Sequence, residues 1–470
     1  MVARFFSNAL LVVALNLVVK GTYLFGVERT VQNLLPEGRY GLYFSLLGLG
    51  MLFQVVADGG IQLFNVRTIA GHRQLLDKYF PYFIGLKLVL GVLFYLLVLA
   101  AALLLGYGPG ALGLLALAAT GQLLNSLVLY LRSNLGGLGR YRLDSFFSIL
   151  DKLVMIVLVG GLLLFAPGEL TVTRFAACQL VSWLLSAVAL LAALRPRLTR
   201  LRPRFHRPTL LLLLRGGAPY ALAVFLMTAY TRTDAIMIER LLPGGAVAVD
   251  HYAAGYRLLD ALNMLGWLLA GLLMPMFARQ FTRGEDLRPL LGASGGALLT
   301  VGLAVAVPLA AYAGPVTELL YTFAEPRTAR VLFFLALAFL GSCLTYVYGS
   351  LLNATGLTGR LNPYFVGAIA LNVGGNLWAI PRYGAPGAAA VTAATQALIG
   401  LLKAALAHRW LGLAAGVLPW GRLALTALLL VGGAAALRSV AAPWLLEAAA
   451  LAALGLAPAA GELRRLLRGG

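Results

Sequence analysis

The chain has 470 residues, of which 61% are hydrophobic and only 11% carry a charge, and its formal net charge is +20. Soluble domains contain roughly 25% charged residues, so this composition excludes a large water-soluble domain and indicates an integral membrane protein. Lys and Arg accumulate in the cytoplasmic loops of membrane proteins, and the basic balance therefore requires no nucleic-acid partner.

Fourteen apolar stretches follow one another along the chain, and each is long enough to cross the ~30 Å hydrocarbon layer of a bilayer as a helix. We therefore expect an all-α integral membrane protein with about 14 transmembrane helices. The predicted spans are 8–33, 40–66, 79–105, 111–131, 145–165, 171–194, 210–238, 251–278, 290–313, 330–352, 362–380, 385–407, 420–437 and 443–460.

The basic residues predict the topology. Most of the 37 Lys and Arg residues lie in alternate gaps between the spans, on the side of the N-terminus, and the largest cluster is the segment RPRLTRLRPRF at 195–205. Because loops rich in Lys and Arg remain in the cytoplasm, we expect both termini to be cytoplasmic.

The basic segment 195–209 is also the predicted linker between two halves of the chain. Residues 1–194 are expected to form an N-lobe of helices 1–6, and residues 210–410 a C-lobe of helices 7–12. Residues 411–470 supply helices 13 and 14 and a basic cytoplasmic tail.

Two short phrases recur in both halves and indicate a duplicated six-helix unit. Glu28-Arg29 precedes a Leu-Leu-Pro sequence, as Glu239-Arg240 does, and the Gly-rich segment 134–140 resembles 353–360. Because six is an even number, both lobes would have the same orientation and be related by a pseudo-two-fold axis along the membrane normal. Two such lobes can rock against each other in alternating access.

Polar side chains within the predicted spans form stripes on single helix faces. The stripes lie in helices 1, 2, 7 and 8, the equivalent pair in each half. They include Asn16, Lys20 and Tyr23; Gln54, Asp58, Gln62 and Asn65; Arg232 on one face of helix 7 and Asp234 on another; and Tyr252, Tyr256, Asp260, Asn263 and Trp267. Ionisable groups in a bilayer are costly and usually face a cavity or a partner. Their concentration in matching helices predicts a shared, water-accessible cavity. The alternative is that pairs such as Lys20–Asp58 and Arg232–Asp234 only hold the bundle together.

The predicted cavity is mildly cationic, which suits an anionic cargo such as a pyrophosphate, because Arg offers paired donors to phosphate oxygens. The candidate substrate-binding residues are Lys20, Arg29, Arg215, Arg232, Arg257, Tyr256 and Trp267. The acidic residues Asp58, Asp234 and Asp260 are candidate counter-ions or sites for a driving proton or Na⁺.

The sequence gives no sign of catalytic chemistry. It contains no GxxxxGK[ST] phosphate loop, no HExxH motif and no Cys/His cluster. The predicted extracytoplasmic gaps are short and leave little room for a catalytic loop. We expect a protein that is not an enzyme and that needs no cofactor and no metal.

Several ordered motifs carry a family resemblance. They are LPEGRYGLY at 35–43, DGG at 58–60, RTIA at 67–70, TDAIMI at 233–238, HYAAGYR at 251–257, NATG at 353–356 and IPRYGAPGAA at 380–389. In this order they resemble bacterial polysaccharide-unit exporters, the polysaccharide transport branch of the multidrug/oligosaccharidyl-lipid/polysaccharide (MOP) exporter superfamily, which includes Wzx-type O-antigen flippases.

The resemblance implies a twelve-helix, two-lobed core with two added helices in the cytoplasmic (inner) membrane of a bacterium. It also implies a secondary transporter that flips undecaprenyl-pyrophosphate-linked oligosaccharide for surface polysaccharide biosynthesis, alongside the glycosyltransferases and polymerase of that pathway. In related flippases, cations in helices 1, 2 and 7–8 line the cavity, which corresponds to Lys20, Arg232 and Arg257 here.

Two alternatives remain open at this point. A cation-coupled multidrug exporter of the same superfamily would favour a net acidic cavity for cationic drugs. A membrane polysaccharide polymerase or glycosyltransferase would need a sizeable extracytoplasmic loop with catalytic Arg or acidic residues.

Overall fold

The structure is a computed structural model, and it describes residues 15–62, 64–65, 75–198, 202–413, 415–437 and 443–468. Within these ranges the regular secondary structure is helical, which confirms the predicted fold class. Ten helices of the described ranges are long and apolar enough to cross a membrane.

The remaining four predicted spans also coincide with helices in the described ranges. Helix is present from residue 15 to 34, while residues 8–14 of the first predicted span lie outside the description. The helices at 207–241 and 362–383 are continuous, but charged, amide and proline residues lower their hydropathy. The last helix has an apolar stretch of Trp444–Pro458. Each predicted span therefore corresponds to a helix in the part of the chain that the structure describes.

The chain separates into two compact units, Met1–Asp250 and His251–Gly470. The elements of unit 1 are η1 (Thr22–Glu28), α2 (Arg29–Leu34), α3 (Arg39–Asp58), α5 (Leu75–Leu104), α6 (Pro109–Gly137), α7 (Tyr141–Phe165), η2 (Pro167–Glu169), α8 (Val172–Leu194), η3 (Arg195–Arg197) and α9 (Arg207–Leu241). Helix α10 (Gly245–Thr282) begins in unit 1 and continues into unit 2.

The division at residue 250 places α9 with the helices that precede it, because α9 packs directly on α3. The predicted linker at 195–209 lies inside unit 1, and its described part includes Arg204, whose backbone N–H donates to the carbonyl oxygen of Pro81 on α5 (3.0 Å). The predicted duplication of a six-helix unit concerns the origin of the sequence, and it stays a prediction.

In unit 1, α3 lies at the centre and contacts α5, α6 and α9, while α6 packs on α8 and α8 on α7. Helix α3 ends at Asp58 because Gly59 and Gly60 both adopt positive φ angles (58° and 71°), which favour glycine. The predicted span 40–66 is therefore interrupted there, and helix resumes at residue 61. A side chain on Gly217 of α9 would overlap the carbonyl oxygen of Gly59, so this turn allows α3 and α9 to approach closely.

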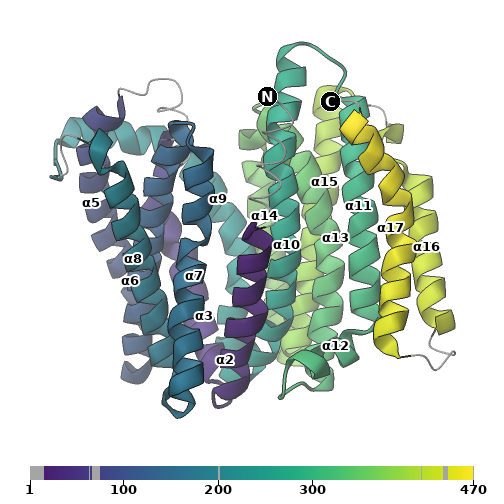
Figure 1. The fold of residues 1–470 in the computed structure, drawn as a ribbon, viewed down its shortest axis with the longest axis horizontal. Coiled ribbons are helices and arrows are strands. Elements are labelled where there is room, and N and C mark those ends of the chain that lie inside the picture. Colours follow the sequence, from purple (N-terminus) through teal and green to yellow (C-terminus); the bar gives the residue numbers. More distant parts are fainter. Residues whose placement is uncertain are drawn as a thin grey trace. The chain divides into compact units, whose positions relative to one another are not determined.

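Unit 2 contains the elements α11 (Arg288–Ala311), α12 (Ala313–Leu320), α13 (Pro326–Ala354), η4 (Thr358–Leu361), α14 (Asn362–Tyr383), α15 (Ala385–Leu411), η5 (Ala415–Val417), α16 (Trp420–Leu437) and α17 (Trp444–Arg468). Helix α13 packs between α11 and α15, and α16 and α17 cover α11 (Figure 1). Tyr312 donates a hydrogen bond to Glu447 (2.7 Å), which fixes α17 to the end of α11.

The contact between α13 and α15 depends on glycine. A Cβ atom on Gly341 would lie 2.5 Å from the backbone nitrogen of Ala397, and one on Gly400 would lie 2.6 Å from the carbonyl oxygen of Gly341. Small residues let membrane helices approach until their backbones touch, which is a principal source of attraction between helices in lipid.

Candidate functional site

The polar face of the first helix packs against α7. The Asn16 side-chain oxygen accepts a hydrogen bond from Ser148 (2.9 Å). The Lys152 ammonium lies 4.4 Å from the centre of the Tyr23 ring, and Lys20 interacts electrostatically with Asp151. Asn16, Lys20 and Tyr23 thus share one face, as their spacing predicts.

Lys20 belongs to a cluster of charges on the first helix, α6 and α7. Its electrostatic partners are Asp151, Arg132 and Lys152. Asp151 forms an ion pair with Lys152 (3.2 Å), and Arg132 pairs with Asp144 (2.8 Å). Among the described residues this cluster therefore has one more cation than carboxylate, and we call it the Lys20 cluster.

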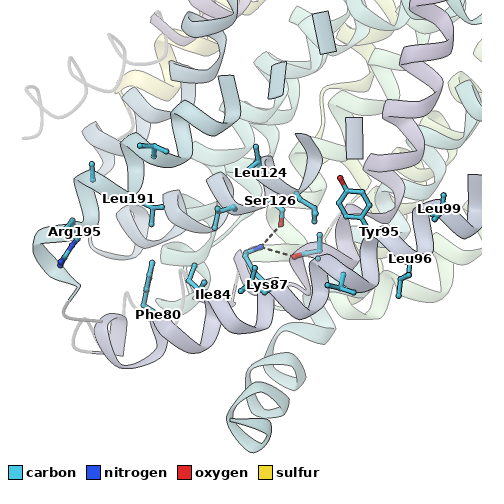
Figure 2. A pocket seen from close by; sticks show the side chains of 18 residues that line it. Phe80, Ile84, Lys87, Tyr95, Leu96, Leu99, Leu124, Ser126, Leu191 and Arg195 are labelled. Atoms are coloured by element: carbon cyan, nitrogen blue, oxygen red, sulfur yellow. Dashed lines mark hydrogen bonds between the residues drawn. The ribbon is translucent and has the colours of Figure 1, made fainter. Parts of the chain in front are cut away.

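Asp58 pairs with Lys87 of α5 rather than with Lys20. The Lys87 ammonium lies 3.4 Å from Asp58 Oδ1 and also donates to Ser126 (2.8 Å) and to the Ala57 carbonyl (3.3 Å), the last two drawn in Figure 2. The alternative pair Lys20–Asp58 is wrong, because Lys20 faces α7 whereas Asp58 ends α3 beside α5. The pair ties α3 to α5, and Ser126 extends the link to α6.

The other candidate residues of unit 1 differ in how far they are buried in the protein. Arg215 is exposed in the first half of α9, Arg232 is half-buried and Asp234 is buried. Residues two apart in a helix do not face each other, so the side chains of Arg232 and Asp234 lie on different faces of α9. Arg29 is half-buried, and its neighbour Glu28 accepts a hydrogen bond from Tyr40 (2.8 Å).

The candidates of unit 2 lie along α10. Tyr256 and Arg257 are buried, and the Tyr256 ring lies 5.6 Å from that of Tyr252. Asp260 is half-buried. The Trp267 side chain is 71% exposed, and it lies about 16 Å along the helix axis from Tyr256. The structure therefore does not bring these two aromatic residues together at one point.

A polar network lies at the C-terminal end of α9. Its residues are not among the candidate site residues. Tyr107, in the turn between α5 and α6, donates to Glu239 (2.7 Å) and shares a hydrogen bond with Ser45 of α3 (3.1 Å). Arg240 pairs with Glu239, and its guanidinium lies 3.9 Å from the centre of the Tyr107 ring. Burial raises the pKa of the Tyr107 hydroxyl, and the Glu239 carboxylate adds to the effect, so the hydroxyl keeps the proton that it donates.

Two lysines inside spans are further candidates that the stripes do not reveal. Lys87 is the centre of the polar contacts between α3, α5 and α6. Lys403 of α15 is buried, and its ammonium lies 5.2 Å from the centre of the Phe365 ring. In the sequence, each of them is a single lysine in an otherwise apolar run. A charged side chain there costs free energy in a bilayer, and this cost is the signal that could have identified them.

Comparisons with known proteins agree with the resemblance of the motifs. Residues 8–281 match the family described as "Polysaccharide biosynthesis protein". No curated protein shows significant sequence similarity to the chain.

Solved structures of MOP superfamily transporters share the fold. The lipid II flippase MurJ in an inward closed conformation is 14% identical, with a TM-score of 0.66, and the match covers 99% of this chain and 98% of that chain. A multidrug resistance MATE family transporter in an inward-facing conformation is 13% identical, with a TM-score of 0.59 over 84% of this chain and 98% of that chain.

A MOP superfamily transporter from Pyrococcus furiosus, described as having a binding pocket of reverse polarity, is 16% identical. Its TM-score is 0.59, and the match covers 86% of this chain and 93% of that chain. At these identities the likeness concerns the fold. With a family match over more than half of its length and this fold throughout, the chain belongs to the polysaccharide biosynthesis protein family and is a multi-pass membrane protein with the fold of MOP superfamily transporters.

Proposed function

We propose that the protein is a secondary transporter that flips an undecaprenyl-pyrophosphate-linked oligosaccharide across the bacterial cytoplasmic membrane. The family match supports a role in polysaccharide biosynthesis, and the fold supports transport. The cargo of such a pathway is a sugar chain on a lipid carrier, joined by a pyrophosphate that carries negative charge.

The single observation that carries the choice of cargo is the cationic excess of the Lys20 cluster. Lys20 adds a positive charge to two existing ion pairs, Lys152–Asp151 and Arg132–Asp144. A charge inside spanning helices is costly, so an uncompensated cation favours binding of an anion. A cationic drug, the cargo expected for a multidrug exporter, would be repelled by the same cluster.

In this proposal Lys20, Arg232 and Arg257 hold the pyrophosphate, with Arg29 and Arg215 attracting it from either membrane surface. Tyr256 and Trp267 contact sugars at different stages, because they lie too far apart along α10 to grip one ring. Asp234 and Asp260 serve as counter-ions or as sites for a driving proton or Na⁺. Asp58 is the counter-ion of Lys87.

The proposal extends to the cellular context. Both termini lie in the cytoplasm, as the distribution of Lys and Arg predicts. Glycosyltransferases supply the cargo on the inner leaflet, and a polymerase uses it on the outer leaflet. The six-helix halves of the sequence act as two lobes in alternating access.

The decisive experiment is leaflet-resolved transport of a defined undecaprenyl-pyrophosphate-linked oligosaccharide in vesicles that contain only this protein. Lys20→Ala is expected to lower the rate about tenfold or more, since a charge-assisted hydrogen bond is worth about 1.5–3 kcal/mol. Lys20→Arg is the matched control, because it keeps the charge. Absence of flipping by the well-folded wild type, or drug efflux in its place, would refute the proposal.

A further inference from the structure

Unit 1 contains an apolar groove that the proposed function does not yet use. It has a volume of about 900 Å³ and lies between α5, α6 and α8, with the end of α3 at one side. Most of its lining is Leu, Val and Ile, and its polar members are Lys87, Tyr95, Ser126 and Arg195 (Figure 2). Lys87 and Ser126 bond each other, and the Tyr95 hydroxyl donates to the Ala116 carbonyl (3.2 Å).

The groove is partly open to the surroundings of unit 1. The lining side chains of Val92 and Val188 are 63% and 56% exposed, and both belong to helices that are long and apolar enough to cross a membrane. An apolar groove between spanning helices is filled by hydrocarbon rather than by water, because it offers water few polar partners.

The length of the groove selects the kind of hydrocarbon chain. On α5 the lining runs from Phe80 to Leu99, which corresponds to about 28 Å at 1.5 Å per residue. This is close to the full ~30 Å thickness of the hydrocarbon layer. A phospholipid tail extends through one leaflet and would fill about half of it, whereas a long prenyl chain can follow the groove from end to end.

One end of the groove carries positive charge. Arg195 lines that end in Figure 2, opposite Leu99, and its guanidinium donates to the Leu198 carbonyl (3.2 Å) with further N–H groups remaining for other acceptors. The backbone of Arg204 lies near this end, because its N–H donates to the carbonyl oxygen of Pro81, the neighbour of the lining residue Phe80. Lys87 adds no net charge in the middle, because Asp58 pairs with it.

We propose that this groove holds the prenyl chain of the diphosphate-linked cargo when the cargo first binds. The diphosphate then lies at the Arg195 end, before it moves to Lys20, Arg232 and Arg257, and the chain is directed past Lys87 toward Leu99. The proposal rests on the proposed function. It implies that the lipid tail is guided along unit 1 instead of moving freely in the bilayer while the sugar crosses.

The test is cross-linking from a photoreactive benzoylphenylalanine placed at single positions of α5, with the full-length protein in phosphatidylglycerol vesicles. Leu88 and Leu99 line the groove near its charged half and at its far end, and both are exposed. Leu93 is the matched control, since it is similarly exposed on α5 but does not line the groove.

Undecaprenyl diphosphate is expected to cross-link at Leu88 and Leu99 and not at Leu93. Farnesyl diphosphate, which has the same head and a short chain, should cross-link at Leu88 only. Undecaprenol, which lacks the diphosphate, should label both groove positions at least about fivefold less. Labelling of all three positions alike, or labelling by phosphatidylglycerol that undecaprenyl diphosphate does not displace, would overturn the proposal.

A variant that fills the groove gives an independent check. Gly91 lines the groove, and a Cβ atom there meets only ordinary contacts at 3.6 Å, so the side chain of Gly91→Leu can start without a clash and extend into the groove. It should reduce cross-linking at Leu99 at least about tenfold. Gly113→Leu on α6 is the control, because nothing lies within 4 Å of its Cβ position. Unchanged labelling in a folded Gly91→Leu protein would contradict the assignment.

The two proposals fail in different ways. If the wild type flips the lipid-linked oligosaccharide without cross-linking at Leu99, the groove assignment is wrong and the proposed function stands. If undecaprenyl diphosphate cross-links in the groove but no cargo is flipped, the transport proposal is wrong and the groove remains a binding site for the lipid.

Discussion

Two contacts, one in each unit, join spanning helices by different means. In unit 1, the ion pair Asp58–Lys87 and the Ser126 hydroxyl connect α3, α5 and α6. In unit 2, α13 and α15 touch through their backbones at Gly341 and Gly400. In the apolar stretch of α5, 33% of the residues are buried, whereas in that of α13 the share is 67%.

This difference shows what each kind of contact can do in hydrocarbon. Apolar side chains gain little by leaving lipid for another helix, so helices associate through close packing or polar bonds. Close packing needs small residues and removes all space between two helices. A polar bond fixes one point and leaves the rest of the helix free to border a groove, as α5 does.

The largest effect is expected where backbones touch. Gly341→Ala places a methyl group against the backbone of Gln396 and Ala397, which cannot rotate away, and we expect a loss of about 3 kcal/mol in the free energy of unfolding. Thermal unfolding of the purified protein in detergent measures it. The control is Gly374→Ala on α14, where nothing lies within 4 Å, and the helix should gain up to about 1 kcal/mol. Equal stability of the two variants would contradict the packing argument.

Breaking the ion pair of unit 1 should cost somewhat less. Asp58→Asn leaves the Lys87 ammonium, which is 8% exposed, without its carboxylate, and the expected loss is about 2 kcal/mol because Asp58 itself is 23% exposed. The double variant Asp58→Asn/Lys87→Met removes both charges and should recover part of that loss. Strictly additive losses in this double-mutant cycle would show that the pair does not hold α3 to α5.

A smaller effect is expected in the network between α3, α9 and the α5–α6 turn. Tyr107→Phe removes the hydroxyl that bonds Glu239 and Ser45, and the loss should be about 1–1.5 kcal/mol, since Arg240 still pairs with Glu239. Tyr383→Phe, at a residue 61% exposed, is the control and should change little. A loss larger than that of Asp58→Asn would mean that this network contributes more to the stability of unit 1 than the ion pair does.

The smallest effect lies outside the spans, between α10 and α11. Hydrogen bonds from the backbone N–H (3.0 Å) and side chain (2.9 Å) of Arg288 lower the pKa of Asp286. A carboxyl group with a lowered folded pKa stabilises the protein above its unfolded pKa of about 3.9, and this contribution disappears as the pH falls through the folded value. Asp286→Asn should therefore lower Tm slightly at pH 7 and by less at pH 3. A difference of the same size at both pH values would rule out this linkage.

Much of the architecture could be predicted from local sequence. Long apolar runs correspond to the observed helices within the described ranges, and helical spacing placed Asn16, Lys20 and Tyr23 on one face. The break after Asp58 was missed because the run of apolar residues continues beyond Gly59 and Gly60. Only the close approach of α9 to this turn explains why a glycine pair ends the helix there.

The partners of the charges were harder to predict. Lys87 is separated from Asp58 by 29 positions and lies on a different helix, so no local spacing relates them. For the same reason, no local spacing distinguishes the alternative partner Asp58 from Asp151, the carboxylate that interacts with Lys20 in the structure. The groove beside Lys87 likewise depends on how α5, α6 and α8 diverge, which leaves no periodic pattern in any one of them.

The sequence by itself determined that the chain spans a membrane many times, which residues are costly there, and which family it belongs to. These properties follow from the length of apolar runs, the price of burying a charge in hydrocarbon and the order of short motifs along the chain. The tertiary structure decided which charge meets which, and where helices touch or leave space. Such contacts join residues far apart in the chain, and they depend on the angle and depth at which whole helices pack.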